Sequence, residues 1–181
     1  MNSSSTRHRR TARRNKPPLL RVASRADAKK IHELIQRNQQ VGHLLPRQLG
    51  ELATHVDRFL VCVDGRGTVV ACAELAPLSS SIAEIRSLVV AEKRRGQGLG
   101  RRLVEELRKR ATVAGYDDLC VFAHQPGYFA RMGFSIVPHT WLPEKITADC
   151  RSCPLFRKCD QYAMVMDLDG PESHIAAQLH V

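Results

Sequence analysis

A basic, glycine-rich stretch near the middle of the chain carries the residue types that bind phosphate groups. Between Arg86 and Leu103, an apolar run is followed by clustered lysine and arginine, by glycines at 96, 98 and 100, and by apolar residues at helical spacing. Glycine lets the backbone approach a ligand closely. The first N–H groups of a helix have no partner within the helix, and the helix dipole favours an anion there. The stretch therefore predicts a loop that binds a phosphate or pyrophosphate at a helix N-terminus.

The spacing of these glycines distinguishes between types of phosphate-binding loop. A Walker loop needs Lys-Ser/Thr after its last glycine, and the dinucleotide fingerprint needs Gly-x-Gly-x-x-Gly; this stretch matches neither pattern. Instead, Arg95-x-x-Gly98-x-Gly100 after an apolar strand resembles the acetyl-CoA loop of the GNAT N-acetyltransferases. A tight turn with a basic rim is the alternative interpretation.

The resemblance implies that acetyl-CoA is the co-substrate and that an amine attacks its thioester directly. Backbone groups at Leu88, Val89 and Val90 would hold the pantetheine arm and contact the thioester carbonyl. The pyrophosphate would lie on the loop residues Arg95, Gly96, Gln97, Gly98, Leu99, Gly100 and Arg101.

Glu84 is the candidate general base. It lies on the strand that leads into the loop, and strand alternation places it on the same face as Arg86 and Leu88. The resemblance supports this role, because similar enzymes often place a glutamate on this strand. An ion pair with Arg86 or another arginine is the alternative role for Glu84.

Tyr128 is the candidate acid for the leaving thiolate. In similar enzymes this acid is usually a tyrosine four residues before the glycine of a Tyr-x-x-x-Gly-Phe pattern. Here Phe129 occupies that place before Gly133, and Tyr128 lies one residue earlier. On a helix the two side chains point about 100° apart. Either Tyr128 serves after a local shift, or water protonates the thiolate.

Three further segments bear on the acceptor amine. Residues 42–49, 59–61 and 142–145 resemble the acetyltransferase domain of bacterial N-acetylglutamate synthases, and in particular the short, single-domain amino-acid acetyltransferases of arginine biosynthesis. This implies acetylation of the α-amine of L-glutamate, with L-glutamine as an alternative acceptor. The rival hypotheses are a GNAT enzyme acting on a protein N-terminus or another small molecule, and a non-catalytic module that binds nucleic acid or metal.

Arg47, Arg86 and Lys145 are the candidates for binding the acceptor. Glutamate brings two carboxylates, and an arginine fork binds a carboxylate bidentately. Arg47 matches a substrate-binding arginine of the similar synthases, Arg86 is placed by strand geometry, and Lys145 follows from the Leu-Pro-Glu-Lys match. A surface cation is the alternative role for each.

Three cysteines near the C-terminus form a Cys-x-x-Cys-x₅-Cys run, at positions Cys150, Cys153 and Cys159. Three thiolates can hold zinc when a fourth ligand joins them, and His139 or Asp160 could serve here. A redox pair, or reduced cysteines in an ordered loop over the acceptor site, are the other interpretations. Zinc is therefore a candidate cofactor, whereas acetyl-CoA is the main expectation.

The elements around these residues follow an alternating α/β pattern. Periodicity and turn residues predict strands near residues 19–23, 59–63, 68–75, 82–90, 116–123, 134–137 and 162–168. Helices are predicted from Ser24 to Gly42, from Leu44 to Val56, over 98–114 and over 126–132, with an irregular segment after residue 137. This order resembles the GNAT fold, a central mixed, mostly antiparallel sheet flanked by helices.

Composition sets the remaining expectations. The net charge is +10, and residues 1–16 carry six cations and no acid, so residues 1–18 are predicted to be a disordered basic arm. The acetyltransferase domain would span residues 19–169, including a cysteine-containing loop at 139–160, and 170–181 would be a tail. Nucleic-acid binding and a transit peptide are the alternatives for the arm.

The same composition bears on compartment and partners. No apolar run approaches the ~18 residues of a membrane span, and no signal peptide is evident. We therefore expect a reducing cytoplasm, an amino-acid substrate, and no membrane or nucleic-acid partner. A homodimer is compatible with the sequence but not required by it.

Overall fold

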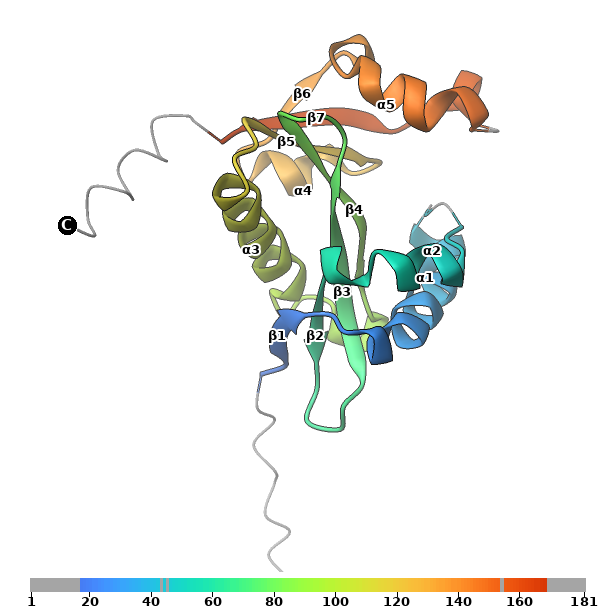
Figure 1. Ribbon diagram of the computed structural model, residues 1–181, viewed down its shortest axis with the longest axis vertical. Coiled ribbons are helices and arrows are strands. Elements are labelled where there is room, and N and C mark those ends of the chain that lie inside the picture. The colour runs from blue at the N-terminus through green and yellow to red at the C-terminus, as the bar shows by residue number, and fades with distance from the viewer. Residues whose placement is uncertain (1–16, 43, 45, 154, 169–181) are drawn as a thin grey trace, which may run out of the picture.

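The computed structural model describes residues 17–42, 44, 46–153 and 155–168, so the predicted basic arm up to residue 16 and the tail at 170–181 lie outside the described residues. The chain forms one twisted sheet with helices on both faces (Figure 1). Its strands are β1 (Leu19–Val22), β2 (Phe59–Val63), β3 (Val69–Pro77), β4 (Ile82–Val90), β5 (Asp118–Ala123), β6 (Ser135–Val137) and β7 (Tyr162–Asp167). Its helices are α1 (Ala28–Gly42), α2 (Leu49–Thr54), α3 (Leu99–Val113), α4 (Pro126–Ala130) and α5 (Pro143–Ala148).

The sheet order is β1-β2-β3-β4-β5-β7-β6. The β4–β5 pairing is parallel, and the other described pairings are antiparallel. The predicted mixed, mostly antiparallel sheet is therefore confirmed. The parallel register runs from Ile82, opposite Asp118, to Ile85, opposite Val121. Since β4 continues to Val90, the last part of this strand extends past its partner and opens the sheet.

Hydrophobic burial holds a helix layer on each face of the sheet. The apolar stripe of α3, which includes Leu103 and Leu107, packs into one core cluster with β4, β5 and β7. The stripe of α1, which includes Ile31 and Ile35, packs with α2 and with Phe59 of β2 in a second cluster. Figure 1 shows α3 on one side of the sheet and α1 with α2 on the other. Both stripes follow the helical spacing seen in the sequence.

A capping box between Ser24 and Asp27 leads into α1. The Ser24 backbone N–H and hydroxyl each donate to Asp27 Oδ2 at 2.8 Å. Arg21 of β1 adds a hydrogen bond of 2.7 Å to the same carboxylate. These bonds hold the pKa of Asp27 well below its usual range, chiefly through the Arg21 hydrogen bond.

Two predicted features of the fold are wrong. The second helix begins at Leu49 rather than Leu44, because its N-cap, Gln48, has an extended backbone conformation. The segment after residue 137 is not wholly irregular, because it contains α5. Pro143 lies in the first turn of this helix, where proline needs no N–H partner. No helix in the described ranges has the length and apolarity to cross a membrane.

Candidate active site

Two adjoining pockets open where β4 extends past β5. The first, of about 530 Å³, is called the cofactor pocket here, and the second, of about 750 Å³, the acceptor pocket. Both are lined by Leu44, Leu88, Arg95, Gln125 and Tyr128. Since they share these residues, a ligand in one pocket can touch a ligand in the other.

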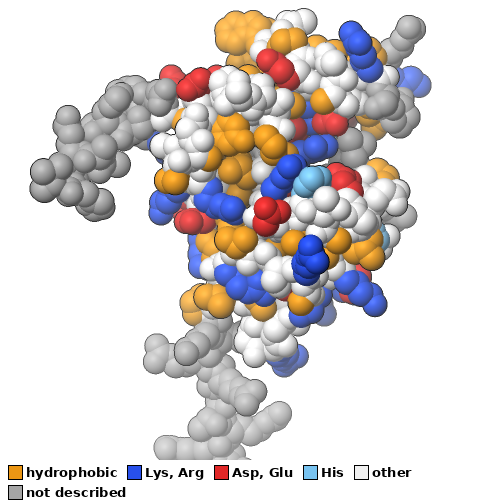
Figure 2. Space-filling model, in the orientation of Figure 1, with side chains coloured by type: hydrophobic (Ala, Val, Ile, Leu, Met, Phe, Trp, Pro, Cys, Tyr) orange, Lys and Arg blue, Asp and Glu red, His pale blue; other side chains and the backbone are white. Residues whose placement is uncertain are grey.

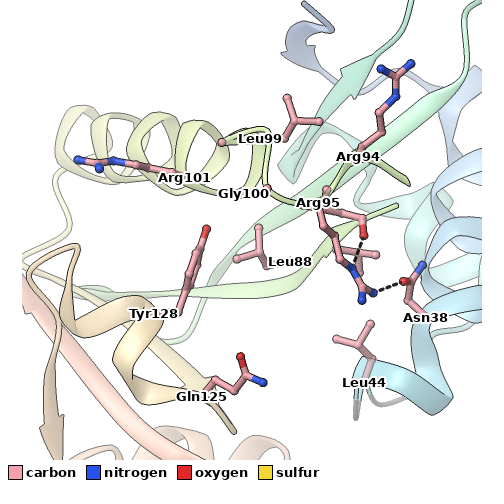
Figure 3. A pocket seen from close by; sticks show the side chains of 14 residues that line it. Asn38, Leu44, Leu88, Arg94, Arg95, Leu99, Gly100, Arg101, Gln125 and Tyr128 are labelled. Atoms are coloured by element: carbon pink, nitrogen blue, oxygen red, sulfur yellow. Dashed lines mark hydrogen bonds between the residues drawn. The ribbon is translucent and has the colours of Figure 1, made fainter. Parts of the chain in front are cut away.

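The cofactor pocket lies between the end of β4 and the N-terminus of α3 (Figure 3). Gly96 and Gly98 both have φ of +74°, a left-handed conformation that glycine adopts without strain, and Gly98 is the N-cap of α3. The expected cofactor residues that line the pocket are Leu88, Val89, Val90, Arg95, Gly96, Gly98, Leu99, Gly100 and Arg101. Gln97 lies outside this lining, and its side-chain amide donates to the Lys93 carbonyl at 3.4 Å.

Two hydrogen bonds orient Arg95, one to α1 and one to the end of β4. Its Nη2 donates to Asn38 Oδ1 at 3.0 Å, and its Nε donates to the Val90 carbonyl at 3.3 Å (Figure 3). Asn38 is itself buried and donates to the Leu34 carbonyl at 2.8 Å. Arg95 therefore fixes the loop to α1 and to the end of β4, while the helix N-terminus supplies backbone donors to an anion.

Tyr128 extends from α4 to the N-terminus of α3. A Cβ placed on Gly100 would lie 2.6 Å from the Tyr128 hydroxyl oxygen, so the glycine makes room for this hydroxyl. Burial raises the pKa of the Tyr128 phenol above its usual 10, which keeps its proton in place at neutral pH. Phe129 is buried instead and packs edge-on against Phe134, with ring centroids 5.5 Å apart. Tyr128, rather than Phe129, is thus the aromatic side chain of α4 that lines both pockets.

Acidic and basic side chains gather between the part of the molecule that carries α5 and the part that carries α2 (Figure 2). Within the acceptor pocket, Lys145 of α5 donates to both carboxylate oxygens of Glu84, at 2.7 and 2.8 Å, and to Asp149 Oδ2 at 2.7 Å. Lys145 and Glu84 are both buried. All three ammonium protons therefore have a carboxylate acceptor, and the pair fastens α5 to β4.

Arg47 is held in a similar way. Its Nη1 donates to Glu74 at 2.8 Å and to Ser87 Oγ at 3.0 Å, while its Nε and Nη2 donate to Glu51 at 3.2 and 2.7 Å. A guanidinium has five N–H donors, so one N–H on Nη2 remains beyond these four bonds. Arg47 also lines the acceptor pocket.

Arg86 is held more loosely than the other two cations. Its closest ion-pair contacts are 3.3 Å to Asp149 and 3.9 Å to Glu84, and its side chain is 27% exposed. The structure thus brings Arg47, Arg86 and Lys145 into one pocket, with Arg86 as the cation that makes the longest contacts.

The three cysteines of the C-terminal run, Cys150, Cys153 and Cys159, also line the acceptor pocket, and all are free thiols. Within the described ranges no three His, Cys, Asp or Glu side chains are grouped to hold a metal ion. The two candidate fourth ligands have other neighbours: the His139 ring lies 5.7 Å from the Phe122 ring, and Asp160 lies 3.0 Å from His124. The described geometry therefore provides no zinc site.

Glu74 and Ser87 are site residues that the sequence prediction missed. Glu74 is a single acid within the apolar strand β3, and a buried acid needs a partner. A lone acid in an apolar strand was therefore the sequence signal that could have identified it. Ser87 was missed because simple alternation places it on the face opposite Glu84 and Arg86, whereas it lines the same pocket as they do.

Comparison with known proteins identifies an acetyltransferase domain. Residues 55–136 match the acetyltransferase (GNAT) domain. An uncharacterized N-acetyltransferase of Chlorobaculum tepidum is 35% identical over 149 residues, which cover 82% of this chain and 96% of that protein. An amino-acid acetyltransferase of Mycobacterium tuberculosis is 30% identical over 139 residues, which cover 75% of this chain and 79% of that protein.

Solved structures show the same fold. The N-acetylglutamate synthase of Neisseria gonorrhoeae, complexed with coenzyme A and N-acetyl-glutamate, aligns with a TM-score of 0.74 and 26% identity over 83% of this chain and 35% of that one. This chain thus spans about a third of that synthase. Rv2747 of Mycobacterium tuberculosis, in complex with CoA, aligns with a TM-score of 0.72 and 24% identity over 83% of this chain and 99% of that one. From the fold, the glycine loop and these relatives together, the chain belongs to the GNAT family of acetyl-CoA-dependent N-acetyltransferases.

Proposed function

We propose that this enzyme acetylates the α-amine of an amino acid, L-glutamate or L-glutamine, as a step of arginine biosynthesis. The observation that carries the proposal is the acceptor pocket, where Arg47, Arg86 and Lys145 meet beside the cofactor pocket. Relatives named amino-acid acetyltransferase, and a structural neighbour that holds N-acetyl-glutamate, support it.

Acetyl-CoA lies in the cofactor pocket in this proposal. Its pyrophosphate binds the backbone donors at the N-terminus of α3, and its pantetheine arm follows Leu88 to Val90. The thioester then lies near Tyr128 and Leu88, which line both pockets. The acceptor nitrogen attacks the thioester carbon, and the carbon–sulfur bond breaks as coenzyme A leaves. Tyr128 gives its proton to the thiolate, and the second proton, which the nitrogen loses as the amide forms, returns to the Tyr128 phenolate through solvent.

The acceptor binds through its carboxylates. Arg86 supplies the main fork, because its present contacts are the longest, and the remaining Arg47 N–H adds a second donor. The side-chain end of the acceptor reaches Lys145 and replaces one of its contacts with Glu84. A Glu84 oxygen then takes a proton from the acceptor ammonium, which makes the amine nucleophilic.

The experiment is CoA release from acetyl-CoA with a panel of amines, with the product identified by mass. The panel contains L-glutamate, L-glutamine, other amino acids, a polyamine and a short peptide with a free N-terminus. Glutarate, which has the carboxylates of glutamate but no amine, is the matched control. We expect turnover with glutamate or glutamine and none with glutarate. Faster turnover of the peptide or polyamine than of any amino acid, or CoA binding without turnover of any amine, would refute the proposal.

A further inference from the structure

Strand β4 contains a bulge at the point where it leaves β5. Val89 lies opposite Cys72 of β3 and Arg86 lies opposite Glu74, so Ser87 and Leu88 together face the single residue between Cys72 and Glu74. Two residues against one define a β-bulge. Ser87 has φ of +51°, a left-handed conformation that an L-residue with a side chain rarely adopts. The bulge is therefore a strained feature that needs support from its surroundings.

The bulge lies between the two pockets. The parallel register with β5 ends at Ile85, two residues before Ser87. Ser87 lines the acceptor pocket, Leu88 lines both pockets, and Val89 and Val90 line the cofactor pocket. The direction in which β4 enters the cofactor pocket is thus set at this one irregular residue.

Two side chains hold Ser87 in place. Arg47 Nη1 donates to its hydroxyl at 3.0 Å, and the Cys72 thiol donates to its carbonyl at 3.7 Å. Burial raises the pKa of the Cys72 thiol to about 12, so it keeps the proton that it donates. Sulfur is a weak donor, and the charged contact from Arg47 is the stronger of the two.

Arg47 is in turn oriented by Glu74. The Glu74 side chain is 2% exposed, and its carboxylate accepts from Arg47 Nη1 at 2.8 Å, the same nitrogen that donates to Ser87. Glu51 holds the other edge of the guanidinium, but its side chain is 42% exposed. A buried carboxylate gives the more rigid anchor, because leaving its partner unpaired in the interior is costly. A continuous chain of contacts therefore runs from Glu74 through Arg47 to the bulge.

We propose that Glu74 is a positioning residue for acetyl transfer: its buried carboxylate orients Arg47, and Arg47 fixes the left-handed bulge at Ser87 that directs β4 along the cofactor. The proposal rests on acetyl transfer from acetyl-CoA and not on which amine accepts the group. Glu74 acts through two other residues, so its removal should affect donor binding and turnover together.

The first test is Glu74→Gln, which keeps the shape of the side chain and removes its charge. Affinity for CoA is measured by titration calorimetry, and kcat is measured with the amine of the panel that turns over fastest. We expect CoA affinity and kcat each to fall about tenfold, because small displacements at a reacting centre cost large factors in rate. Glu33→Gln, which removes a carboxylate from an exposed pair with Arg37, is the control and should change neither quantity.

The second test separates positioning from general stability. Glycine adopts the left-handed conformation without strain, so Ser87→Gly should make the bulge independent of Arg47. We therefore expect Glu74→Gln combined with Ser87→Gly to recover most of the lost CoA affinity. A recovery of this kind would not follow from a role in stability alone, and the melting temperature of each variant records that role separately.

The proposal is overturned when Glu74→Gln leaves CoA affinity unchanged. It is also overturned when the double variant Glu74→Gln/Ser87→Gly binds CoA as weakly as Glu74→Gln alone. Should Glu74→Gln fail to fold, Ser87→Ala and Ser87→Gly decide the matter. Both variants lack the hydroxyl, but only Ser87→Ala retains the strain of the left-handed conformation. The Ser87→Ala protein must therefore bind CoA more weakly than the Ser87→Gly protein does. Equal affinities would refute the proposal. Since CoA binding needs no acceptor, this readout stands even when no amino acid is acetylated.

Discussion

The cofactor pocket is lined mainly by one continuous stretch of chain, whereas the acceptor pocket is lined by charged side chains from β4, from α5 and from the segment before α2. Glycine conformation and helix geometry shape the first pocket, where Gly96 and Gly98 have positive φ. Ion pairs between distant residues shape the second, as Lys145 with Glu84 and Arg47 with Glu74 show. The cofactor pocket is thus shaped mainly by backbone, with the Glu74–Arg47 pair acting on it only through the bulge at Ser87, whereas the acceptor pocket is shaped by side chains.

This difference implies that changes in the acceptor pocket carry a stability cost that changes in the cofactor loop do not. Each buried cation of the acceptor pocket neutralises a buried carboxylate. Removal of either partner therefore leaves the other buried without a counter-charge. The exposed charges around α3, such as the Arg101–Glu105 pair, have solvent as an alternative partner.

Lys145→Met should lower the free energy of unfolding by about 3–5 kcal/mol, because it leaves Glu84 buried without its cation. Urea unfolding followed by circular dichroism measures the change. Adding Glu84→Gln should recover part of the loss. Lys109→Met, at an exposed pair with Glu106, is the control and should change stability little. A loss no larger than that of the control would show that the buried pair is not a structural contact.

Tyr128→Phe should lower kcat about a hundredfold while leaving CoA affinity nearly unchanged, because the hydroxyl acts only on the leaving thiolate. Steady-state kinetics and calorimetry give the two quantities. The acid role requires the protonated phenol, whose pKa burial raises. Activity of the wild type should therefore not decline from Tyr128 ionisation until the pH exceeds about 10. An unchanged kcat in the variant would show that water, and not Tyr128, protonates the thiolate.

Gly100→Ala should weaken CoA binding about tenfold, because its Cβ would lie 2.6 Å from the Tyr128 hydroxyl and displace that ring toward the cofactor. Gly50→Ala, where nothing lies within 4 Å of the new Cβ, is the control. Combining Gly100→Ala with Tyr128→Phe removes the clashing oxygen and should restore affinity for CoA. Failure of this restoration would mean that Gly100 serves the cofactor directly rather than making room for Tyr128.

Arg101→Gln should have the smallest effect, weakening CoA binding about threefold at physiological salt. Its side chain is 69% exposed and paired with Glu105 at 2.7 Å, so it attracts the cofactor phosphates through solvent. The effect should disappear near 1 M salt, where screening is nearly complete. Calorimetry at two salt concentrations measures it, and a salt-independent loss would indicate a direct hydrogen bond to the cofactor.

The contrast between the pockets also explains how far the sequence could predict the site. The cofactor loop is local: glycine spacing, an apolar strand before it and an amphipathic helix after it predict both β4 and α3, and the structure has both. The acceptor pocket depends on pairings between residues far apart in sequence, such as Lys145 with Glu84. The sequence indicated which cations would line this pocket, but not which carboxylates would pair with them.

The bulge at Ser87 had no local signal, because serine is neither a usual left-handed residue nor a strand breaker. Alternation along β4 predicts one shared face for Glu84, Arg86 and Leu88, and the bulge adds Ser87 to the same pocket. Helix α5 was missed for a related reason. It has only six residues, Pro143–Ala148, and its contact with the sheet through Lys145 supplies stability that a short helix lacks on its own.

The most direct test of the account is two-substrate steady-state kinetics of Arg86→Gln with the acceptor found in the panel. Arg86 lines the acceptor pocket and lies outside the lining of the cofactor pocket. We expect KM for the amino acid to rise roughly tenfold or more, since a bidentate contact to a carboxylate is lost. KM for acetyl-CoA should stay within about twofold of the wild-type value, because Arg86 does not line the cofactor pocket. A parallel rise in both constants, or a rise for acetyl-CoA alone, would contradict the assignment of Arg86 to the acceptor.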